Sequence, residues 1–255
     1  MSTSPSTSPT HELDAPWERL ERLIGAAGCT ALQRAHVMVV GLGGVGSWAV
    51  EALARSGIGQ LTIVDHDRVC ATNINRQLPA TCATIGALKT SCMAERVMEI
   101  NRACVVHAVP MRFDSHTARD ILHGKPQVVI DAIDSVAEKA LLLALCWETE
   151  IPVVSSCGAG GRRDPAQIRV ADLAQVQGDA LARAVRQALR RAHGITAREG
   201  RLGIQAVYSS EPVRVAARGA GGARGAHKPG TICHVTGTFG FFCAAAAIDV
   251  LLKGT

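Results

Sequence analysis

Residues 37–57 read VMVVGLGGVGSWAVEALARSG: an apolar run, a glycine loop, then apolar residues at helical spacing. The run Val37–Val40 is typical of a strand that is buried on both faces. The spacing over 45–56, with Gly57 as a stop signal, predicts a helix. Glycines between a strand and a helix allow a tight turn that brings helix N–H groups against phosphate. The four glycines at this turn are Gly41, Gly43, Gly44 and Gly46. The stretch therefore predicts a nucleotide site.

Similar apolar runs recur along the chain, with helical segments between them. They are Val37–Val40, Leu61–Asp65, Cys104–Val109, Val128–Asp131 and Val153–Ser156. Strands that are apolar throughout indicate a parallel sheet covered by helices on both faces. The fold class predicted is α/β, a Rossmann-like doubly wound and mostly parallel sheet over residues 36–161.

The pattern changes after residue 161. It predicts an arginine-rich helix around Asp179–Ala192, a mobile loop over Gly219–Gly230 and an apolar helix over Ile232–Leu252. The threonines, glycines and single acid of the last segment favour a buried helix over a membrane span. Because 255 residues fit one large domain, we expect a disordered tail over 1–14 and one domain over 15–255. Residues 162–255 are its basic, substrate-side extension.

The composition excludes several classes of protein. Hydrophobic residues make up 47% of the chain and charged residues 19%, which excludes a disordered chain. The nine cysteines include no Cys-x-x-Cys pair, which argues against a zinc ribbon or a redox dithiol. Since no signal peptide is visible, we expect reduced thiols and a cytoplasmic location.

Polar residues after the second strand bear on which nucleotide binds. Asp65 lies nineteen residues after Gly46, where a carboxylate can accept hydrogen bonds from a ribose, and this much fits NAD as well as ATP. Cations at this edge neutralise the charge that builds on phosphate oxygens when a triphosphate is cleaved, whereas a dehydrogenase needs them only for a 2′-phosphate. The polar residues at this edge are Asp67, Asn73, Asn75, Arg76, Gln77 and Lys89, and two of them, Arg76 and Lys89, are cations.

The fourth run ends in Asp131-Ala132-Ile133-Asp134-Ser135, at the sheet edge where the nucleotide is expected. Mg²⁺ at such sites is held by one or two carboxylates and by phosphate oxygens. We interpret Asp134 as the metal ligand, Ser135 as a nucleotide contact and Asp131 as a helix cap. The alternative is that both acids are helix caps.

Together these pieces resemble the adenylating family that includes ubiquitin-activating enzymes and the bacterial activators of ubiquitin-like sulfur carriers. The matching residues are Gly41–Gly46, Asp65, Asp67, Asn73, Asn75-Arg76-Gln77, Lys89 and Asp134. The resemblance implies that Asp65 holds the ribose of ATP and that Asp134 holds Mg²⁺. It assigns the phosphates to Asn75, Arg76 and Lys89. It also implies a homodimer in which an N-terminal arginine, best matched by Arg22, reaches the neighbour's ATP.

The resemblance extends furthest to the branch of the family that modifies tRNA. It continues through Gly158–Gly161, Asp164–Ile168, Asp172–Ala174 and Thr236–Phe241. It departs at Cys157, where a glycine is expected, and over Val213–Thr231. For this branch the implied reaction is ATP-dependent cyclisation of the threonylcarbamoyl group on the adenosine beside the anticodon, with net loss of water. The implied partners are tRNA, a second copy of the chain and a cysteine desulfurase system, and no DNA.

The implied reaction needs no covalent nucleophile. The substrate carboxylate attacks the α-phosphate of ATP to give an acyl-adenylate, and the substrate's own nitrogen then closes the ring and expels AMP. Alignment and charge neutralisation by Arg76, Lys89, Arg22 and Mg²⁺ suffice. We therefore expect the cysteines to act as small apolar residues, with Cys157 and Cys233 as the thiols to test.

Three other functions stay open at this point. Activation of the C-terminal glycine of a ubiquitin-like sulfur carrier keeps the adenylation and changes the substrate. An NAD(P)-dependent oxidoreductase fits the glycine loop alone. A nucleotide-sensing module without catalysis predicts that Arg76 and Lys89 are dispensable.

Positive charge is concentrated in the second half of the chain. Residues 1–161 carry 13 lysines and arginines against 16 acids, whereas residues 162–255 carry 14 against 6. We interpret the second half as a surface that docks RNA phosphates. The residues assigned to it are Arg162, Arg163, Arg183, Arg186, Arg190 and Arg191.

Overall fold

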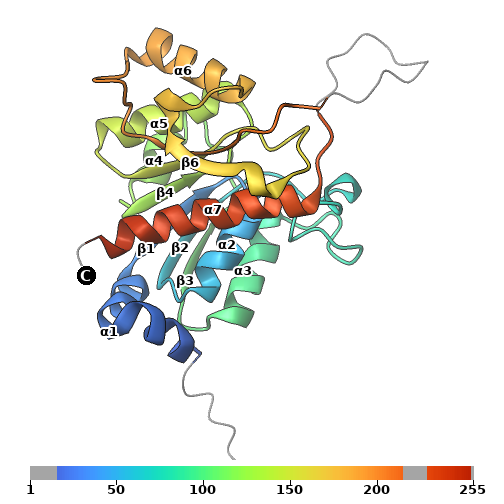
Figure 1. The fold of residues 1–255 in the computed structure, drawn as a ribbon. Coiled ribbons are helices and arrows are strands. Elements are labelled where there is room, and N and C mark those ends of the chain that lie inside the picture. The colour runs from blue at the N-terminus through green and yellow to red at the C-terminus, as the bar shows by residue number, and fades with distance from the viewer. Residues whose placement is uncertain (1–15, 215–228, 254–255) are drawn as a thin grey trace, which may run out of the picture.

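The computed structural model describes residues 16–214 and 229–253. Within them, seven strands form one sheet in the order β3-β2-β1-β4-β5-β7-β6 (Figure 1). The strands are β1 His36–Val40, β2 Gln60–Val64, β3 Val105–Val109, β4 Val128–Asp131, β5 Val153–Ser156, β6 Ile168–Asp172 and β7 Gln205–Ser209. β6 is antiparallel to β7, and the other neighbouring pairs are parallel. The predicted Rossmann-like α/β fold is confirmed.

Helices cover both faces of the sheet. Those in the described residues are α1 Glu18–Arg34, α2 Gly46–Arg55, α3 Lys89–Ile100, α4 Ala118–Leu122, α5 Val136–Glu148, α6 Ala180–His193 and α7 Cys233–Leu252. Single turns of 3-10 helix lie at Ala71–Asn73, Pro165–Gln167 and Leu173–Gln175. Helices α1, α2, α3 and α7 contribute to the core on one face, and α4, α5 and α6 to the core on the other. The molecule is therefore a three-layer sandwich.

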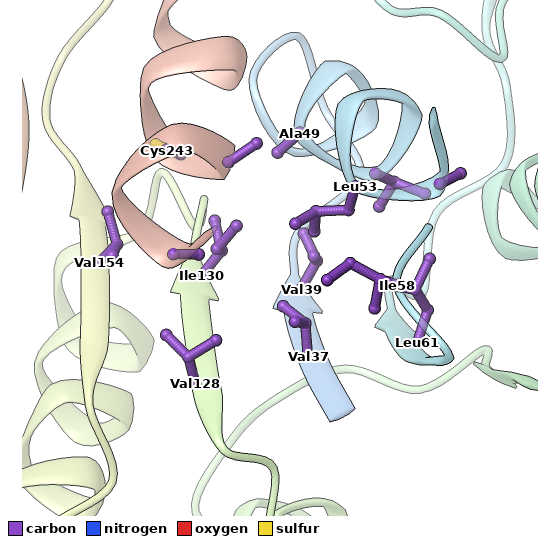
Figure 2. Packing of buried hydrophobic residues seen from close by; sticks show 14 of the residues in the cluster. Val37, Val39, Ala49, Leu53, Ile58, Leu61, Val128, Ile130, Val154 and Cys243 are labelled. Carbon is purple, nitrogen blue, oxygen red and sulfur yellow. The ribbon is translucent and has the colours of Figure 1, made fainter. Parts of the chain in front are cut away.

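Alternate residues of the central strands feed these two cores, because successive side chains of a strand point to opposite faces. Val39 of β1 and Ile130 of β4 lie on the same side as Leu53 of α2 and Cys243 of α7 (Figure 2). Met38 of β1 belongs to the opposite core. Strands buried on both faces must be apolar at every position, which is why these runs could be recognised in the sequence.

One of the predicted strands is not buried as expected. β3 pairs with β2 alone and ends the sheet, and its residues are half-buried or exposed, with Val105 54% exposed. The prediction that the run Cys104–Val109 is buried on both faces is therefore wrong. An edge strand keeps apolar side chains for contact with its single neighbour and stays open on its free side.

Two strands that the sequence pattern did not indicate extend the sheet beyond residue 161. β7 continues it next to β5, with Val154 opposite Gln205, and β6 turns back antiparallel along the outer side of β7. Their sequences, IRVAD and QAVYS, mix polar and apolar residues. The basic half of the chain thus shares one sheet with the glycine-loop half, although the sequence places them on either side of a boundary at 161.

Helix α7 returns across the sheet and packs against α2 (Figure 1). By length and composition it could span a membrane, but half of its apolar window is buried inside the fold. Phe239 and Cys243 are fully buried among core residues of the sheet and α2, as expected of a buried terminal helix. The predicted tail, 1–14, and positions 219–228 of the predicted loop lie outside the described residues.

Candidate functional site

A cavity of about 820 Å³ opens at the carboxyl ends of the central strands. The strand order reverses between β1 and β4, which is where open α/β sheets bind their ligands. The predicted site residues that line it are Gly41, Gly43, Gly44, Asp65, Asp67, Asn73, Arg76, Gln77, Lys89, Asp134 and Ser135. Three predicted residues, Gly46, Asn75 and Arg22, are not part of its wall.

The glycine loop is packed too closely for side chains. Gly41 has φ +94°, and a Cβ there would lie 2.7 Å from the carbonyl oxygen of Ala132. A Cβ on Gly46 would lie 1.8 Å from the carbonyl oxygen of Gly41. Gly46 therefore acts inside the loop, because its close approach to Gly41 allows α2 to begin directly behind the loop.

Asp65 connects the end of β2 to the glycine loop. Its Oδ2 accepts a 2.6 Å hydrogen bond from the backbone N–H of Leu42, and its Oδ1 accepts one of 2.8 Å from the N–H of Asp67. Asp65 is 9% exposed and lines the cavity. One carboxylate thus fixes both the phosphate loop and the turn where a ribose is expected.

Lys89 is the first residue of α3 and is almost fully buried. Its Nζ lies 2.8 Å from Oδ2 of Asp67 and 3.7 Å from Oδ2 of Asp65. Ligand atoms of Asp65, His66 and Asp67 lie within 4.8 Å of one another, a spacing that could hold a metal ion. Because the ammonium of Lys89 pairs with both Asp65 and Asp67, we assign the cluster to positioning Lys89 at the cavity wall.

Arg76 is held at the cavity wall by its own segment. Its guanidinium donates to the carbonyl oxygen of Thr72, at 2.8 Å, and to Oδ1 of Asn75, at 2.9 Å. Asn75 in turn donates to the carbonyl oxygen of Thr231. Asn75 thus orients Arg76 from outside the cavity, which differs from the phosphate contact that the resemblance implied.

The two neighbouring amides have different environments. Asn73 accepts a hydrogen bond from the N–H of Cys70 and so closes the 3-10 turn that carries this segment. Gln77 is 8% exposed, and its buried Oε1 finds no hydrogen-bond partner among the described residues. A buried acceptor without a donor is uncommon and costs free energy. Gln77 lines the cavity, so a ligand that carries an N–H or O–H group would suit it.

Asp131 and Asp134 have separate roles, but the role predicted for Asp131 is wrong. Asp131 is fully buried and pairs with Lys139 Nζ at 2.7 Å and Ser155 Oγ at 2.7 Å. It is therefore part of an interior ion pair and does not cap α5. Asp134 lies on the cavity wall, as expected of a carboxylate that faces a nucleotide. Ser135 lies beside it as the N-cap residue of α5.

Two charged residues at the cavity were missed by sequence reasoning. Arg112, in the segment after β3, pairs with Glu138 in the first turn of α5, and Glu138 also contacts Ser135 Oγ. The guanidinium of Arg112 lowers the pKa of Glu138 below its ordinary value. Arg112 follows a strand end, as Asp65 and Asp134 do, and that position is the signal that could have identified it.

The C-terminal segment completes the cavity from the other side. Pro229, Thr231 and Thr236 line it, and a Cβ on Gly44 would lie 3.2 Å from the side chain of Thr236. The beginning of α7 therefore packs directly over the phosphate loop. The sequence alone gave no reason to place these residues, nearly two hundred positions away, at the same site.

One family model matches nearly the whole chain. The ThiF family model covers residues 18–253. The chain belongs to the ThiF family. Within it, a tRNA threonylcarbamoyladenosine dehydratase of Haemophilus influenzae is 44% identical over 238 residues, which is 91% of each chain. The family resemblance predicted from the sequence motifs is thereby confirmed.

Solved structures of ThiF family members agree with this relationship. The Escherichia coli tRNA N6-threonylcarbamoyladenosine dehydratase in complex with ATP is 39% identical, with a TM-score of 0.87, over 93% of this chain and 94% of that one. The same enzyme in complex with AMP gives a TM-score of 0.88 at 38% identity, over 97% of this chain and 98% of that one. A molybdopterin-synthase adenylyltransferase of Salmonella typhimurium is 35% identical over 128 residues, which is only 50% of this chain.

Two of the arginines assigned to the RNA-docking surface make hydrogen bonds inside the fold of this ThiF family member. Arg162 is 2% exposed, and its guanidinium is surrounded by protein acceptors, so its assignment to an RNA-docking surface is wrong. Arg186 donates two 2.9 Å hydrogen bonds to the carbonyl oxygens of Leu173 and Val176 and holds the turn before α6. The four that remain exposed are Arg163, Arg183, Arg190 and Arg191.

Arg22 lies away from the cavity of its own chain. Its side chain is 73% exposed and pairs with Glu18 one helical turn away. α1 is kinked at Gly25, where φ is +74°. A role for Arg22 at the site of a second subunit stays a prediction.

Of the two thiols predicted to be worth testing, Cys157 is not activated. Cys157 lines the cavity, but burial raises its pKa to about 12. A thiol with this pKa is protonated at neutral pH and is a poor nucleophile. Cys233, at the beginning of α7, is half-buried. The site contains cations, a phosphate loop and acids, which suits adenylation without a covalent enzyme intermediate.

Proposed function

We propose that this ThiF family protein catalyses the ATP-dependent dehydration of threonylcarbamoyladenosine in tRNA. The observation that carries the proposal is that similarity to the dehydratases runs through both halves of the chain. Similarity to the molybdopterin-synthase adenylyltransferase, by contrast, covers half of it. The second half supplies a wall of the cavity, through Leu181, Thr231 and Thr236. A substrate shared with the dehydratases fits a site built from both halves.

ATP fits the charges of the cavity. The glycine loop presents backbone N–H groups, and Arg76 and Lys89 provide positive charge beside it. The carboxylate of Asp65 marks the ribose side. Arg76 and Lys89 stabilise the charge that develops on the α-phosphate when the substrate carboxylate attacks it and pyrophosphate leaves. With a nicotinamide cofactor, Arg76 and Lys89 would have no catalytic role, because no triphosphate is cleaved.

Mg²⁺ suits the acid that lines the cavity at β4. Carboxylate oxygens are the ligands that Mg²⁺ prefers, completed by phosphate oxygens and water. Asp65 and Asp67 hold the ammonium of Lys89, and we assign the ion to Asp134, which lines the cavity just after β4. When bound, Mg²⁺ neutralises phosphate charge.

The second step requires alignment more than chemistry from the protein. Once the acyl-adenylate has formed, the nitrogen of the same substrate group attacks the activated carbonyl, and AMP leaves. The cavity walls must exclude water and keep the nitrogen near that carbonyl, because holding two groups in register is worth several kcal/mol of barrier, about 7–11 in the best cases. Cys157, which is protonated, does not compete with the nitrogen as a nucleophile.

The decisive experiment incubates the protein with ATP, Mg²⁺ and tRNA that carries threonylcarbamoyladenosine, followed by mild nucleoside mass spectrometry. We expect a product lighter by one water and stoichiometric AMP. Asp134→Asn should slow the reaction on the order of a hundredfold. No mass change under conditions where ATP binds contradicts the proposal. Pyrophosphate exchange stimulated by a ubiquitin-like sulfur carrier and not by tRNA would then identify the rival function.

We extend the proposal to a cytoplasmic homodimer in which Arg22 of one subunit serves the site of the other, working with a cysteine desulfurase system. A mixing experiment tests the dimer. Arg22→Ala and Lys89→Met should each be inactive alone, because each lacks a cation at every site. Mixed dimers contain one site with Lys89 and a partner's Arg22, so activity should return on mixing. Failure of two folded variants to complement removes Arg22 from the site.

A further inference from the structure

One part of the cavity wall is the segment Ser156–Gly160, which begins at the last residue of β5. Arg162 is one of the buried side chains that hold this segment, and its side chain alone is 1% exposed. Arg162 Nε donates to the carbonyl oxygen of Gly158 at 3.0 Å. A guanidinium therefore fixes the wall from behind and does not face the cavity.

The same guanidinium reaches two other parts of the fold. Its NH1 donates to the carbonyl oxygens of Ser209, at 2.7 Å, and Glu211, just after β7. Its NH2 donates to Oδ2 of Asp179 at 3.0 Å. Arg162 thus connects the wall to the end of β7 and to the start of α6. Four of its five N–H groups have partners, and one planar side chain is what allows this.

Asp179 supports the wall directly. Its Oδ2 also accepts from the backbone N–H of Gly158 at 3.1 Å, and its Oδ1 caps α6 by accepting from Ala182 N–H at 2.8 Å. A Cβ on Gly158 would lie 3.2 Å from Oδ2 of Asp179. Both the N–H and the carbonyl oxygen of Gly158 are therefore fixed, one by Asp179 and the other by Arg162.

A second buried acid, Glu211, lies beside Arg162. Glu211 is 3% exposed and accepts 2.8 Å hydrogen bonds from the backbone N–H groups of Arg163 and Asp164. These bonds lower its pKa, so it stays charged at neutral pH and holds the chain that leaves the wall. We call Arg162, Asp179 and Glu211 the hub.

The order of the strands separates the hub from the nucleotide residues. The glycine loop, Asp65 and Lys89 belong to the β1 and β2 side of the cavity, whereas the hub supports the ends of β5 and β7. The acyl group must lie in the part of the cavity that the nucleotide does not fill, with its carboxylate directed at the α-phosphate. We propose that Arg162 and Asp179 are positioning residues that fix the Gly158–Gly160 wall for the tRNA-borne acyl group. This inference rests on the proposed function for the identity of that group.

The test uses conservative variants of the hub with a neighbouring control. Arg162→Lys keeps the charge but offers three donors from one point, which cannot serve four partners. Asp179→Asn keeps the size of the side chain and removes its charge. Arg169→Lys is the control, because Arg169 lies nearby on β6, is exposed and has no assigned role at the site or in RNA docking. Both hub variants should lower kcat with tRNA at least tenfold and change KM for ATP less than twofold. The control should resemble wild type.

Hydrogen exchange of the intact protein provides a readout that does not depend on the substrate. In both hub variants, amides of residues 156–161 should exchange faster, while amides of residues 41–47 should keep their wild-type rates. Faster exchange in both loops, or KM for ATP rising in step with the loss of kcat, would indicate a general loss of stability and overturn the inference. Unchanged exchange and unchanged kcat would overturn it as well.

The two proposals can fail separately. A wild-type protein that removes no water from the tRNA contradicts the proposed function. If exchange then still rises only over 156–161 in the hub variants, the hub remains the support of that wall and only its substrate changes. If wild type is active and the hub variants match it, the function stands and the positioning role is excluded.

Discussion

Lys139 Nζ lies 2.7 Å from Asp131 Oδ2, and the two side chains are 2% and 0% exposed. Lys139 also donates to the carbonyl oxygen of Ile133 at 3.0 Å, and Asp131 accepts from the N–H of the same residue. The pair thus joins α5 to the end of β4, beneath the turn whose Ala132 carbonyl lies against Gly41. The floor of the nucleotide cavity rests on this buried ion pair.

Removing one member of the pair should be costly. Lys139→Met leaves the carboxylate of Asp131 buried with only neutral hydrogen bonds, so we expect the free energy of unfolding to fall by about 3–5 kcal/mol. Urea denaturation measures this change. Lys253→Met, at an exposed position, should stay within about 0.5 kcal/mol of wild type. Equal stabilities for the two variants would show that the pair does not support the fold.

Gly41 should tolerate no side chain, for a reason that a second glycine can isolate. Gly41 and Gly200 both have positive φ, +94° and +75°, but only Gly41 would place a Cβ against backbone. Gly200→Ala should therefore cost only the strain of the left-handed conformation, about 1–2 kcal/mol. Gly41→Ala should cost more and weaken ATP binding at least tenfold. Calorimetry with ATP makes the comparison, and equal ATP affinities would contradict the close packing of the loop.

The part of the site that lies directly at the ends of strands and helices could be predicted from the sequence. The glycine loop, Asp65 and Lys89 lie at strand and helix ends, where backbone geometry alone decides what faces the nucleotide. The strands that are buried on both faces could be recognised by their unbroken apolar runs. β6 and β7 gave no such signal, because their exposure alternates or varies along the strand.

Residues that act through distant partners could not be predicted. Arg162 has the sequence context of a surface arginine, and only the approach of Asp179 and the carbonyl oxygens at the end of β7 makes it part of a buried hub. Asp131 likewise reads as a helix cap until Lys139 and Ser155 are seen beside it. Burial of a charge depends on tertiary contacts that periodicity does not contain.

Cys157 should be inert as a nucleophile even though it lines the cavity. Burial raises its pKa to about 12, so the protonated thiol persists at every pH below that value and the reactive thiolate is scarce at pH 7–9. Cys157→Ala should keep kcat within a few-fold of wild type. Iodoacetamide at pH 8 should label the exposed Cys70 and Cys82 first, as peptide mass spectrometry would show. Inactivation that tracks alkylation of Cys157 would contradict this.

The exposed arginines of α6 should dock tRNA without affecting ATP. α6 starts at the cavity, where Leu181 lines the wall, and carries Arg183, Arg190 and Arg191 outward on its exposed positions. Phosphate contacts release counterions, and each lost contact lowers the slope of log affinity against log salt by about 1. Changing all three to Glu should therefore weaken tRNA binding and lower the slope of log affinity against log salt by about 2–3. The affinity for ATP should stay unchanged.

The control for this triple variant carries the same change in net charge elsewhere. Arg34, Arg102 and Arg119 are exposed residues outside α6. Changing these three to Glu lowers the net charge equally, so a loss of tRNA affinity that came from overall charge would appear in both triple variants. Filter binding over a range of salt concentrations measures both. An equal loss in the two variants would remove α6 as the docking surface, whereas a loss confined to the α6 variant would show that the basic half guides the tRNA to the cavity.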